Sequence, residues 1–538
     1  MVNQRDSLCW RAVDLGHASI RWRDDVFAVR DLGEHSTPYG SGLDARLFDL
    51  EIGADDDFER RSMEVPTMLM LCELELDQYE RQLRLSSKSP PNNTPRVFPQ
   101  WRQIEQLCAS KSLGVLESVT QQDKQLWIKS PQGEFTPRAL LAQSLAQHLT
   151  PDAVIGERSY HTPINGLLWL RDLGHSPLLT SMIYRSLTEL PFPSGGSLGV
   201  SIATLMGVVP PQRLHNHLGL WGVLDIGEGS ASWSLIELSA SSVMDRIIFK
   251  ELASYGQNWV GEQALSRALL SDHLEQNHHM WSELSAQERG AWVSYAHEQT
   301  RAFMRASWPS YLPYPDPAPS TFDMSELSGS SLDVFKRFQY GTYLGVLAWI
   351  EHSLTQHRIG PEALRGIWVT GRQGVTLISK LRRILSSVNI KVAPPHAALR
   401  GAHRFIRSTL APHNSFCYQA EEVSMYALKL YDHHEEITQT LLEEQERLPT
   451  VAQVMVGPTS GNLSLVLSAY GAPSVTIAEH PPIDERRLLR VYYEGPHLFE
   501  VEWVDVSPQT SNAPSARSQI QTPLKTFNAE TRSEWRLT

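Results

Sequence analysis

Residues 222–230 have the sequence Gly-Val-Leu-Asp-Ile-Gly-Glu-Gly-Ser, and residues 233–238 continue with Trp-Ser-Leu-Ile-Glu-Leu. The first apolar run predicts a strand that ends at Asp225, and Gly227 and Gly229 favour a tight turn before a second strand. Because glycine places no Cβ between the backbone amides and an anion, such a turn can bind phosphate oxygens. The carboxylate of Asp225 would then face the metal ion that accompanies the phosphates.

The same pattern occurs near the N-terminus, where residues 10–22 have the sequence Trp-Arg-Ala-Val-Asp-Leu-Gly-His-Ala-Ser-Ile-Arg-Trp. Here Asp14 follows the apolar run and Gly16 opens the turn. One aspartate before a glycine turn is weak evidence, since most such turns only reverse the chain. Two copies in separate halves of the chain predict a clamp that holds one phosphate-bearing ligand between two lobes.

Composition limits the class of protein. The chain has 538 residues, 41% of them hydrophobic and 20% charged, which predicts roughly two to four globular domains. Its 48 basic and 60 acidic residues give a net charge of −12, and this balance argues against a nucleic-acid partner, which usually requires a basic face. The four cysteines form no Cys-x-x-Cys pair, so neither a disulfide framework nor a zinc site is predicted.

The sequence also gives no indication of a membrane protein. No apolar run reaches the ~18 residues of a membrane span, and the polar first residues are unlike a signal peptide. We therefore expect a cytoplasmic protein with no membrane partner.

Strands dominate the first part of the chain and helices the middle. Short apolar segments predict strands over residues 1 to about 80 and a hairpin at 113–129, and a helical pattern then runs from Thr136 to Leu149. After the second hairpin, the apolar spacing lengthens to that of helices. The predicted helices cover residues 260–274, 288–306, 331–357 and 375–385, and a strand is predicted at 364–371.

After about residue 420 the helical periodicity stops. Short strands separated by Gly, Pro and Asn are predicted at 426–431, 451–456, 463–469, 475–479, 488–493 and 498–506. This spacing predicts a separate small β-sandwich over residues 420–507. Residues 508–538 are rich in Ser, Thr, Gln, Asn and Pro, so we expect a disordered tail.

The order of these features resembles that of the DnaK-type heat-shock protein 70 chaperones. In that family two Asp-x-Gly hairpins, a helical subdomain, a strand that ends in glycine and a β-domain follow one another. Residues 14–16 resemble the first phosphate motif of the family, and residues 225–230 resemble the second. The resemblance implies an α/β fold in which a two-lobed actin-like ATPase domain, of the ribonuclease H-like kind, spans residues 8–405 and precedes the β-sandwich.

Further segments are similar to family motifs that surround the nucleotide. Residues 256–262 are placed like its Gly-Asp-x-x-x-Gly-Gly-Glu segment, residues 298–301 like its adenosine-contacting Glu-x-x-Lys, and residues 369–372 like its adenosine motif. The resemblance implies that ATP or ADP binds with Mg²⁺ between the lobes. The implied site consists of Asp14 and Asp225 as catalytic residues that order Mg²⁺ through water, Gly16, Gly227, Gly229 and Ser230 at the phosphates, and Glu298, Arg301, Gly371 and Arg372 around the nucleoside.

Several positions depart from the family pattern. His17 and Ala18 stand where the family has two threonines that donate to phosphate and to metal-bound water. Ser232 replaces an aspartate, and a glutamate of the family would fall near Leu198. These changes remove groups that order the metal shell.

The catalytic lysine of the family has no clear counterpart, and only Lys88 and Arg96 are candidates. Losing a charged group beside the γ-phosphate costs about 3 kcal/mol, or about a hundredfold in rate, because phosphoryl transfer depends on positioned charges. Binding can survive such a loss. We therefore expect nucleotide binding with weak or absent hydrolysis, so that the protein is an ATP hydrolase only if the site remains active.

The resemblance implies a molecular chaperone whose β-domain engages unfolded or specific client polypeptide, with a co-chaperone as a further partner. However, the apolar interdomain linker of the family is not recognisable in residues 408–416, and we find no helical lid. The alternative is therefore a catalytically degraded, nucleotide-sensing scaffold for a dedicated partner. An actin-fold sugar kinase would also use two Asp-x-Gly hairpins, but the terminal β-domain argues against it.

Two other signals need weighing. Residues 195–199, Gly-Gly-Ser-Leu-Gly, match the Gly-x-Ser-x-Gly elbow of α/β-hydrolases, which would make Ser197 a nucleophile between a strand and a helix. Two prolines in residues 190–194 argue against a buried central strand there, so this hypothesis is less favoured. Segments 272–279 and 432–434 carry aspartates and histidines, which we interpret as exposed helix and loop residues rather than metal ligands.

Overall fold

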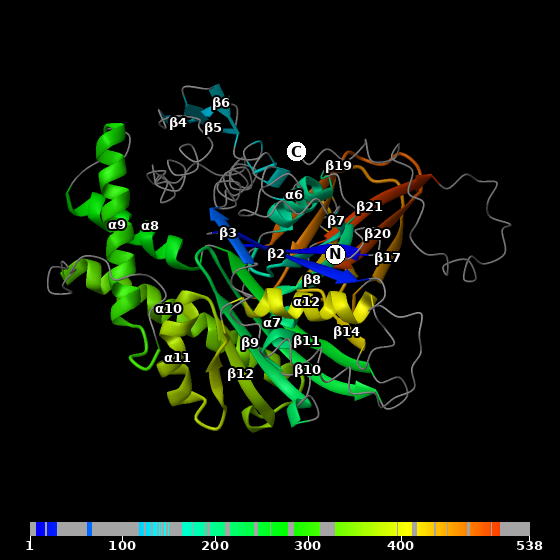
Figure 1. The fold of residues 1–538 in the computed structure, drawn as a ribbon. Coiled ribbons are helices and arrows are strands. Elements are labelled where there is room, and N and C mark those ends of the chain that lie inside the picture. Colours follow the sequence, from blue (N-terminus) through cyan, green and yellow to red (C-terminus); the bar gives the residue numbers. More distant parts are fainter. Residues whose placement is uncertain are drawn as a thin grey trace. The chain divides into compact units, whose positions relative to one another are not determined.

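The computed structural model describes residues 7–16, 19–28, 62–66, 118–122, 125–130, 133–136, parts of 139–149, 164–209, 216–241, 246–277, 284–312, 329–410 and 417–505, with short gaps inside the longer ranges. The chain divides into two compact units, Met1–Glu421 and Glu422–Thr538 (Figure 1). Both α-helices and mixed sheets contribute to the fold, as the sequence predicts. Within the described part of the chain, the helices are too short or too polar to cross a membrane.

The first sheet of unit 1 is built around a central strand from the N-terminal hairpin. Its order is β3-β2-β1-β7-β8, in which β1 pairs with β2 and β2 with β3 in antiparallel fashion, while β1–β7 and β7–β8 are parallel. The bounds are Ser7–Leu15 for β1, Ser19–Ala28 for β2, Ser62–Pro66 for β3, Ile164–Arg171 for β7 and Ser194–Gly199 for β8.

The second sheet of unit 1 repeats this order. It runs β11-β10-β9-β12-β13, with the β9–β10 and β10–β11 pairs antiparallel and the β9–β12 and β12–β13 pairs parallel. A sixth strand, β14, adds to the outer edge of β11 in parallel. The bounds are Gly219–Ile226 for β9, Ser230–Ser241 for β10, Arg246–Asn258 for β11, Leu364–Thr370 for β12, Ile390–Val392 for β13 and Cys417–Glu421 for β14.

The helices occupy matching positions in the two halves. A parallel strand pair requires a crossover connection, and helix α6 (Pro177–Thr188) connects β7 to β8 as α11 (Arg372–Ile384) connects β12 to β13. Helix α7 (Val200–Val208) then follows β8, and α12 (Ala397–Leu410) follows β13. Unit 1 therefore contains the same arrangement of strands and helices twice, and β1 and β9 are equivalent strands.

Helices α7 and α12 pack against each other through two glycines (Figure 1). A Cβ at Gly207 would lie 1.9 Å from the carbonyl oxygen of Ala397, and a Cβ at Gly401 would lie 1.7 Å from that of Ala203. Arg404 Nη1 also donates to the carbonyl oxygens of Met206 (2.5 Å) and Val209 (2.9 Å) at the C-terminal end of α7. Only glycine allows so close an approach of two backbones.

The core around these helices joins the two sheets. One buried cluster takes residues from both sheets and both helices, including Ala12, Leu168, Val223, Ile236, Ile202 and Ile406. The opposite face of the second sheet is covered by α11 and by α10 (Gly329–Gln356). Trp233 Nε1 on β10 donates to Ser353 Oγ on α10 (3.1 Å), which fixes the helix on the sheet.

A helical subdomain lies between β11 and α10 in the sequence. It consists of α8 (Glu262–Gln276) and α9 (Ala286–Ala306). Helix α9 begins with a capping box, in which Ser285 Oγ accepts from the Glu288 amide and the Glu288 carboxylate accepts from the Ser285 amide. These helices confirm the predictions at 260–274 and 288–306.

Unit 2 consists of two antiparallel sheets. The four-stranded sheet has the order β16-β15-β18-β19 and the three-stranded sheet the order β17-β20-β21. The bounds are Ala427–Asp432 for β15, Ile437–Leu442 for β16, Thr450–Val456 for β17, Leu463–Ser468 for β18, Val475–His480 for β19, Arg487–Gly495 for β20 and Leu498–Asp505 for β21. In unit 1, a further antiparallel sheet has the order β4-β5-β6 and consists of β4 (Ser118–Gln122), β5 (Gln125–Ser130) and β6 (Gly133–Phe135).

The structure adds strands that the sequence pattern did not predict. Long strand β11 carries residues 256–258, which we interpreted only as part of a nucleotide motif, and β16 falls in a polar segment. Strand β14, at the start of the segment expected to form the β-sandwich, pairs with β11 in unit 1 instead. The expected tail at 508–538 lies outside the described residues.

Candidate functional site

Two aspartates occupy equivalent places in the repeated sheets. Asp14 is the penultimate residue of β1, and Asp225 is the penultimate residue of β9. In the register, Asp14 lies opposite Arg21 in its hairpin, and Asp225 lies opposite Ser232 in its own. Both hairpins expected from the sequence are therefore present, and each presents its aspartate at the same end of the central strand.

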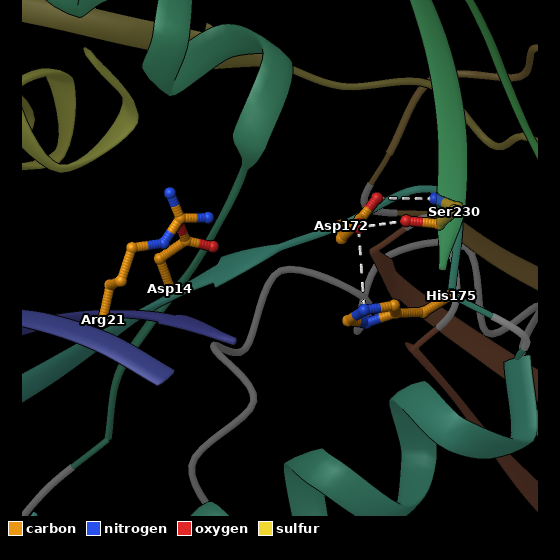
Figure 2. A network of polar contacts seen from close by, with 6 residues as sticks. Asp14, Arg21, Asp172, His175 and Ser230 are labelled. Carbon is orange, nitrogen blue, oxygen red and sulfur yellow. Dashed lines mark hydrogen bonds and ion pairs between the residues drawn. The ribbon is translucent and has the colours of Figure 1, made fainter. Parts of the chain in front are cut away.

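Asp14 forms an ion pair inside its own hairpin. Its Oδ2 lies 3.0 Å from Arg21 Nη2, and Asp14 as a whole is only 7% exposed (Figure 2). Arg21 is a cation that sequence reasoning missed. The hairpin register makes the pairing predictable in principle, because residues directly opposite in an antiparallel pair point to the same face.

Asp225 has the most perturbed carboxyl group of the site. Burial raises its pKa, the neighbouring carboxylates of Asp172 and Asp14 raise it further, and Arg21 lowers it, which leaves the pKa of Asp225 at about 7. Asp14 and Arg21 come from the first sheet and Asp225 from the second. The structure thus brings the ends of β1 and β9 within electrostatic reach of each other.

Asp172, which directly follows β7, is a third carboxylate that sequence reasoning missed. Its Oδ1 accepts from the Gly174 amide (2.8 Å), and its Oδ2 accepts from Ser230 Oγ (2.7 Å). His175 Nε2 lies 3.6 Å from the same Oδ2 (Figure 2). Through its hydrogen bond with Ser230, Asp172 joins the first sheet to the second hairpin. A signal was present in the sequence, because residues 172–175 and residues 14–17 both have the sequence Asp-Leu-Gly-His.

The second hairpin closes as a tight turn, as the glycines predict. The Gly227 amide donates to the Ser230 carbonyl (2.9 Å), and a Cβ at Gly227 would have 4.0 Å to its nearest neighbour, so the turn is open there. The N-terminus of α8 lies against this turn. The Gln263 amide donates to the Glu228 carbonyl (2.8 Å), and a Cβ at Gly261 would lie 2.4 Å from that oxygen.

The strand end at Gly371 also meets the second hairpin. Gly371 has φ +75°, and a Cβ there would lie 2.1 Å from the Ile226 carbonyl oxygen and 2.8 Å from Asp225 Oδ1, so glycine is required. Next to it, Arg372 Nε lies 3.5 Å from Glu262 Oε1 at the start of α8. The structure therefore gathers Asp225, Gly371, Arg372 and Glu262 at one end of the second sheet.

Other residues implied by the resemblance are placed less closely. Gly16 directly follows β1, and Gly229 lies in the turn between β9 and β10. Glu298 is exposed and Arg301 half-buried on α9, and no hydrogen bond or ion pair of the described residues connects either to the hairpin. Their adenosine contact stays a prediction. The segments holding His17, Ala18, Lys88 and Arg96 lie outside the described residues.

The hydrolase elbow is not formed. Ser197 lies within β8 rather than at a strand-to-helix turn, and its Oγ accepts from Arg171 Nε (2.8 Å). The serine is thus held in a sheet by a buried arginine. A nucleophile at this position would lack the exposed turn that the elbow provides.

The histidine segments require one correction. We expected His273 to be exposed, but it is buried at 9% exposure, stacks on Tyr295 with ring centroids 4.5 Å apart and meets Trp292 edge-on. Burial lowers its pKa, and Asp272 partly offsets that shift. The prediction of an exposed side chain was wrong because the imidazole ring of His273 packs against two aromatic side chains. Among the described residues, no group of three or more His, Cys, Asp or Glu is arranged to ligate a metal directly.

A scan of protein-family models against the chain found no match, and a search of the curated proteins found none either.

Proposed function

We propose that the protein has a two-lobed actin-like, ribonuclease H-like fold related to that of DnaK-type chaperones, and that it binds ATP or ADP with Mg²⁺ between its lobes. The repeated sheet order supports this proposal, because two equivalent sheets place two equivalent hairpins at one interface. The close α7–α12 crossing between the sheets supports it as well.

One observation carries the proposal. Asp14 and Asp225 lie at the ends of equivalent strands. Burial raises the pKa of Asp225, and the carboxylates of Asp172 and Asp14 raise it further, to about 7. Carboxylates crowded in this way repel one another in the free protein. A divalent cation between them would relieve that repulsion, so charge complementarity favours a bound metal.

The residues present fit hydrated Mg²⁺ with a nucleotide. Mg²⁺ prefers oxygen ligands and keeps several of its waters, and Asp14 and Asp225 offer carboxylate oxygens for those waters. When bound, the ion would neutralise phosphate charge. The open turn at Gly227 leaves space for an anion beside its backbone, and Gly371 and Arg372 lie at the same strand ends.

The same residues support weak or absent hydrolysis. Arg21 is the cation placed at the first hairpin, but Asp14 already engages it. Opposite Asp225, Ser232 offers a hydroxyl instead of the carboxylate of the resembling family, so the metal shell is held by fewer charges. Weaker ordering of the metal and the attacking water slows phosphoryl transfer more than it weakens binding.

For unit 2 we propose a binding role for an unfolded or specific client polypeptide. Strand β17 is the edge of its three-stranded sheet, and Val451 and Met455 on it are 42% and 51% exposed. An exposed edge strand with apolar side chains can pair with an extended chain. The alternative remains a nucleotide-sensing scaffold that binds one dedicated partner.

Three measurements test these proposals on the full-length chain. Isothermal titration with ATP and Mg²⁺ should give a Mg²⁺-dependent binding heat, and the absence of heat at millimolar nucleotide would overturn the nucleotide site. A single-turnover assay with labelled ATP should show slow or no hydrolysis. Binding of a panel of unrelated unfolded peptides favours the chaperone, whereas binding to none of them favours the scaffold.

A further inference from the structure

The loop at residues 172–175 lies directly on the second hairpin and its neighbouring strand. A Cβ at Gly174 would lie 2.4 Å from Ser230 Cβ, and a Cβ at Gly256 on β11 would lie 2.1 Å from the Leu173 carbonyl oxygen. The backbone of the first lobe therefore touches that of the second at this point. Glycines on both sides make the contact possible.

The Asp172 carboxylate is held in this contact from several sides. It accepts from the Gly174 amide and from Ser230 Oγ, and His175, which is 1% exposed, lies against it. Ser230 is itself 4% exposed, and a hydroxyl has a single hydrogen to donate. In this conformation that hydrogen is directed to Asp172 rather than to any other acceptor.

We propose that Asp172 acts as an internal substitute for phosphate, which latches the two lobes together and must be displaced from Ser230 when a nucleotide binds. This inference rests on the proposed nucleotide site. It assigns Asp172 as a positioning residue that sets the affinity of that site, a role that neither hairpin motif indicates.

Electrostatics supports the displacement. A carboxylate and a phosphate are both anions that accept hydrogen bonds, so they compete for the same hydroxyl and repel each other when both are close. Removing the charge of Asp172 therefore frees the Ser230 hydroxyl for a phosphate oxygen and removes the repulsion between the carboxylate and the phosphate.

The expected size follows from one hydrogen bond to a charged group. The net free-energy contribution of such a hydrogen bond corresponds to about a tenfold change in affinity. Asp172→Ala should thus bind Mg²⁺·ATP about tenfold more tightly than the native chain. Asp172→Asn should show a smaller gain, because the amide oxygen can still accept from Ser230 without the negative charge.

The test is a titration of the full-length chain with Mg²⁺·ATP in native, Asp172→Ala, Asp172→Asn, Ser230→Ala and doubly substituted forms. Ser230→Ala alone should change the affinity little, because the hydroxyl hydrogen of Ser230 is already donated to Asp172 in the native chain. In the Asp172→Ala background it should remove much of the gain, an effect that loss of structure alone would not produce. Glu237→Gln, on the same strand as Ser230 but ion-paired with Lys250, is the matched control for charge removal and should bind as the native chain does.

The outcomes separate the two proposals. If the native chain binds nucleotide but both Asp172 variants bind it equally or more weakly, the latch is wrong and the site stands. If no form binds nucleotide, both the site and the latch are overturned. Circular dichroism of each variant shows whether it is folded, and Asp172→Asn, which keeps the shape of the side chain, decides the matter if Asp172→Ala does not fold.

Discussion

At the scale of single residues, the site is defined by carboxylates that lie close enough to one another for their negative charges to repel. Asp14 is stabilised by Arg21, and Asp172 by Ser230 and an amide. The pKa of Asp225 is raised to about 7, chiefly by burial and further by the carboxylates of Asp172 and Asp14. Groups with such shifted pKa values cluster at functional sites. The shifted pKa of Asp225 is thus consistent with the proposed ligand site.

The shift at Asp225 predicts how stability depends on pH. Its pKa in the folded chain lies above the value of 3.8 for the free group, so the folded state binds more protons between about pH 4 and 7. The stability contributed by this residue is complete below pH 4 and is lost as the pH rises through 7. Asp225→Asn should therefore raise the free energy of unfolding at pH 8 by on the order of 2 kcal/mol, with little effect at pH 4. Urea unfolding of both forms at the two pH values measures this, and an equal effect at both would contradict it.

His273 predicts the opposite dependence in the helical subdomain. Burial lowers its pKa, so the unfolded state binds its proton first as the pH falls below 6.5. Its contribution to stability is present above pH 6.5 and is lost on acidification. His273→Phe keeps a ring between Trp292 and Tyr295, and the melting temperature of this variant should fall less between pH 7.5 and 5 than that of the native chain. His434→Gln, at an exposed position, serves as the control and should follow the native chain.

At the scale of elements, the α7–α12 crossing depends on two glycines with backbone atoms where a Cβ would stand. The helices α8 to α11 were predicted, because an apolar period near 3.6 is a local signal, whereas α6 and α12 were not. The strands β14 and β16 were not, since their place depends on partners far away in sequence or on polar surface positions. Asp172 was missed although residues 172–175 have the same sequence as residues 14–17, because only the β1–β7 pairing brings its loop to the site.

The crossing gives a direct mutational prediction. Gly401→Ala places a methyl group 1.7 Å from the Ala203 carbonyl oxygen, so the helices must separate and the chain should lose about 2–3 kcal/mol of stability. Gly341→Ala on α10 is the matched control, because nothing lies within 4 Å of its Cβ. There the change should stabilise the helix by about 0.5–1 kcal/mol. Urea unfolding measures both, and equal effects of the two substitutions would contradict the packing account.

At the scale of the whole molecule, unit 1 contains one arrangement of strands and helices twice, with an aspartate at the end of each central strand. The sequence predicted the two hairpins, whereas the position of Gly371 and Arg372 around a nucleoside stays a prediction. It could not predict the repeat itself, since the parallel pairs β1–β7 and β9–β12 join segments separated by long stretches of chain. Long-range pairing leaves no periodic trace in a local window.

The central claim is that the two hairpins hold one nucleotide together. A double-mutant cycle in Mg²⁺·ATP affinity tests it most directly, with the native chain, Asp14→Asn, Asp225→Asn and the double variant titrated under identical conditions. The account predicts that each single change weakens binding at least about tenfold, and that the double change weakens it by less than the product of the two, because both aspartates order the same metal ion. Native affinity in either single variant, or effects that multiply independently, would contradict it.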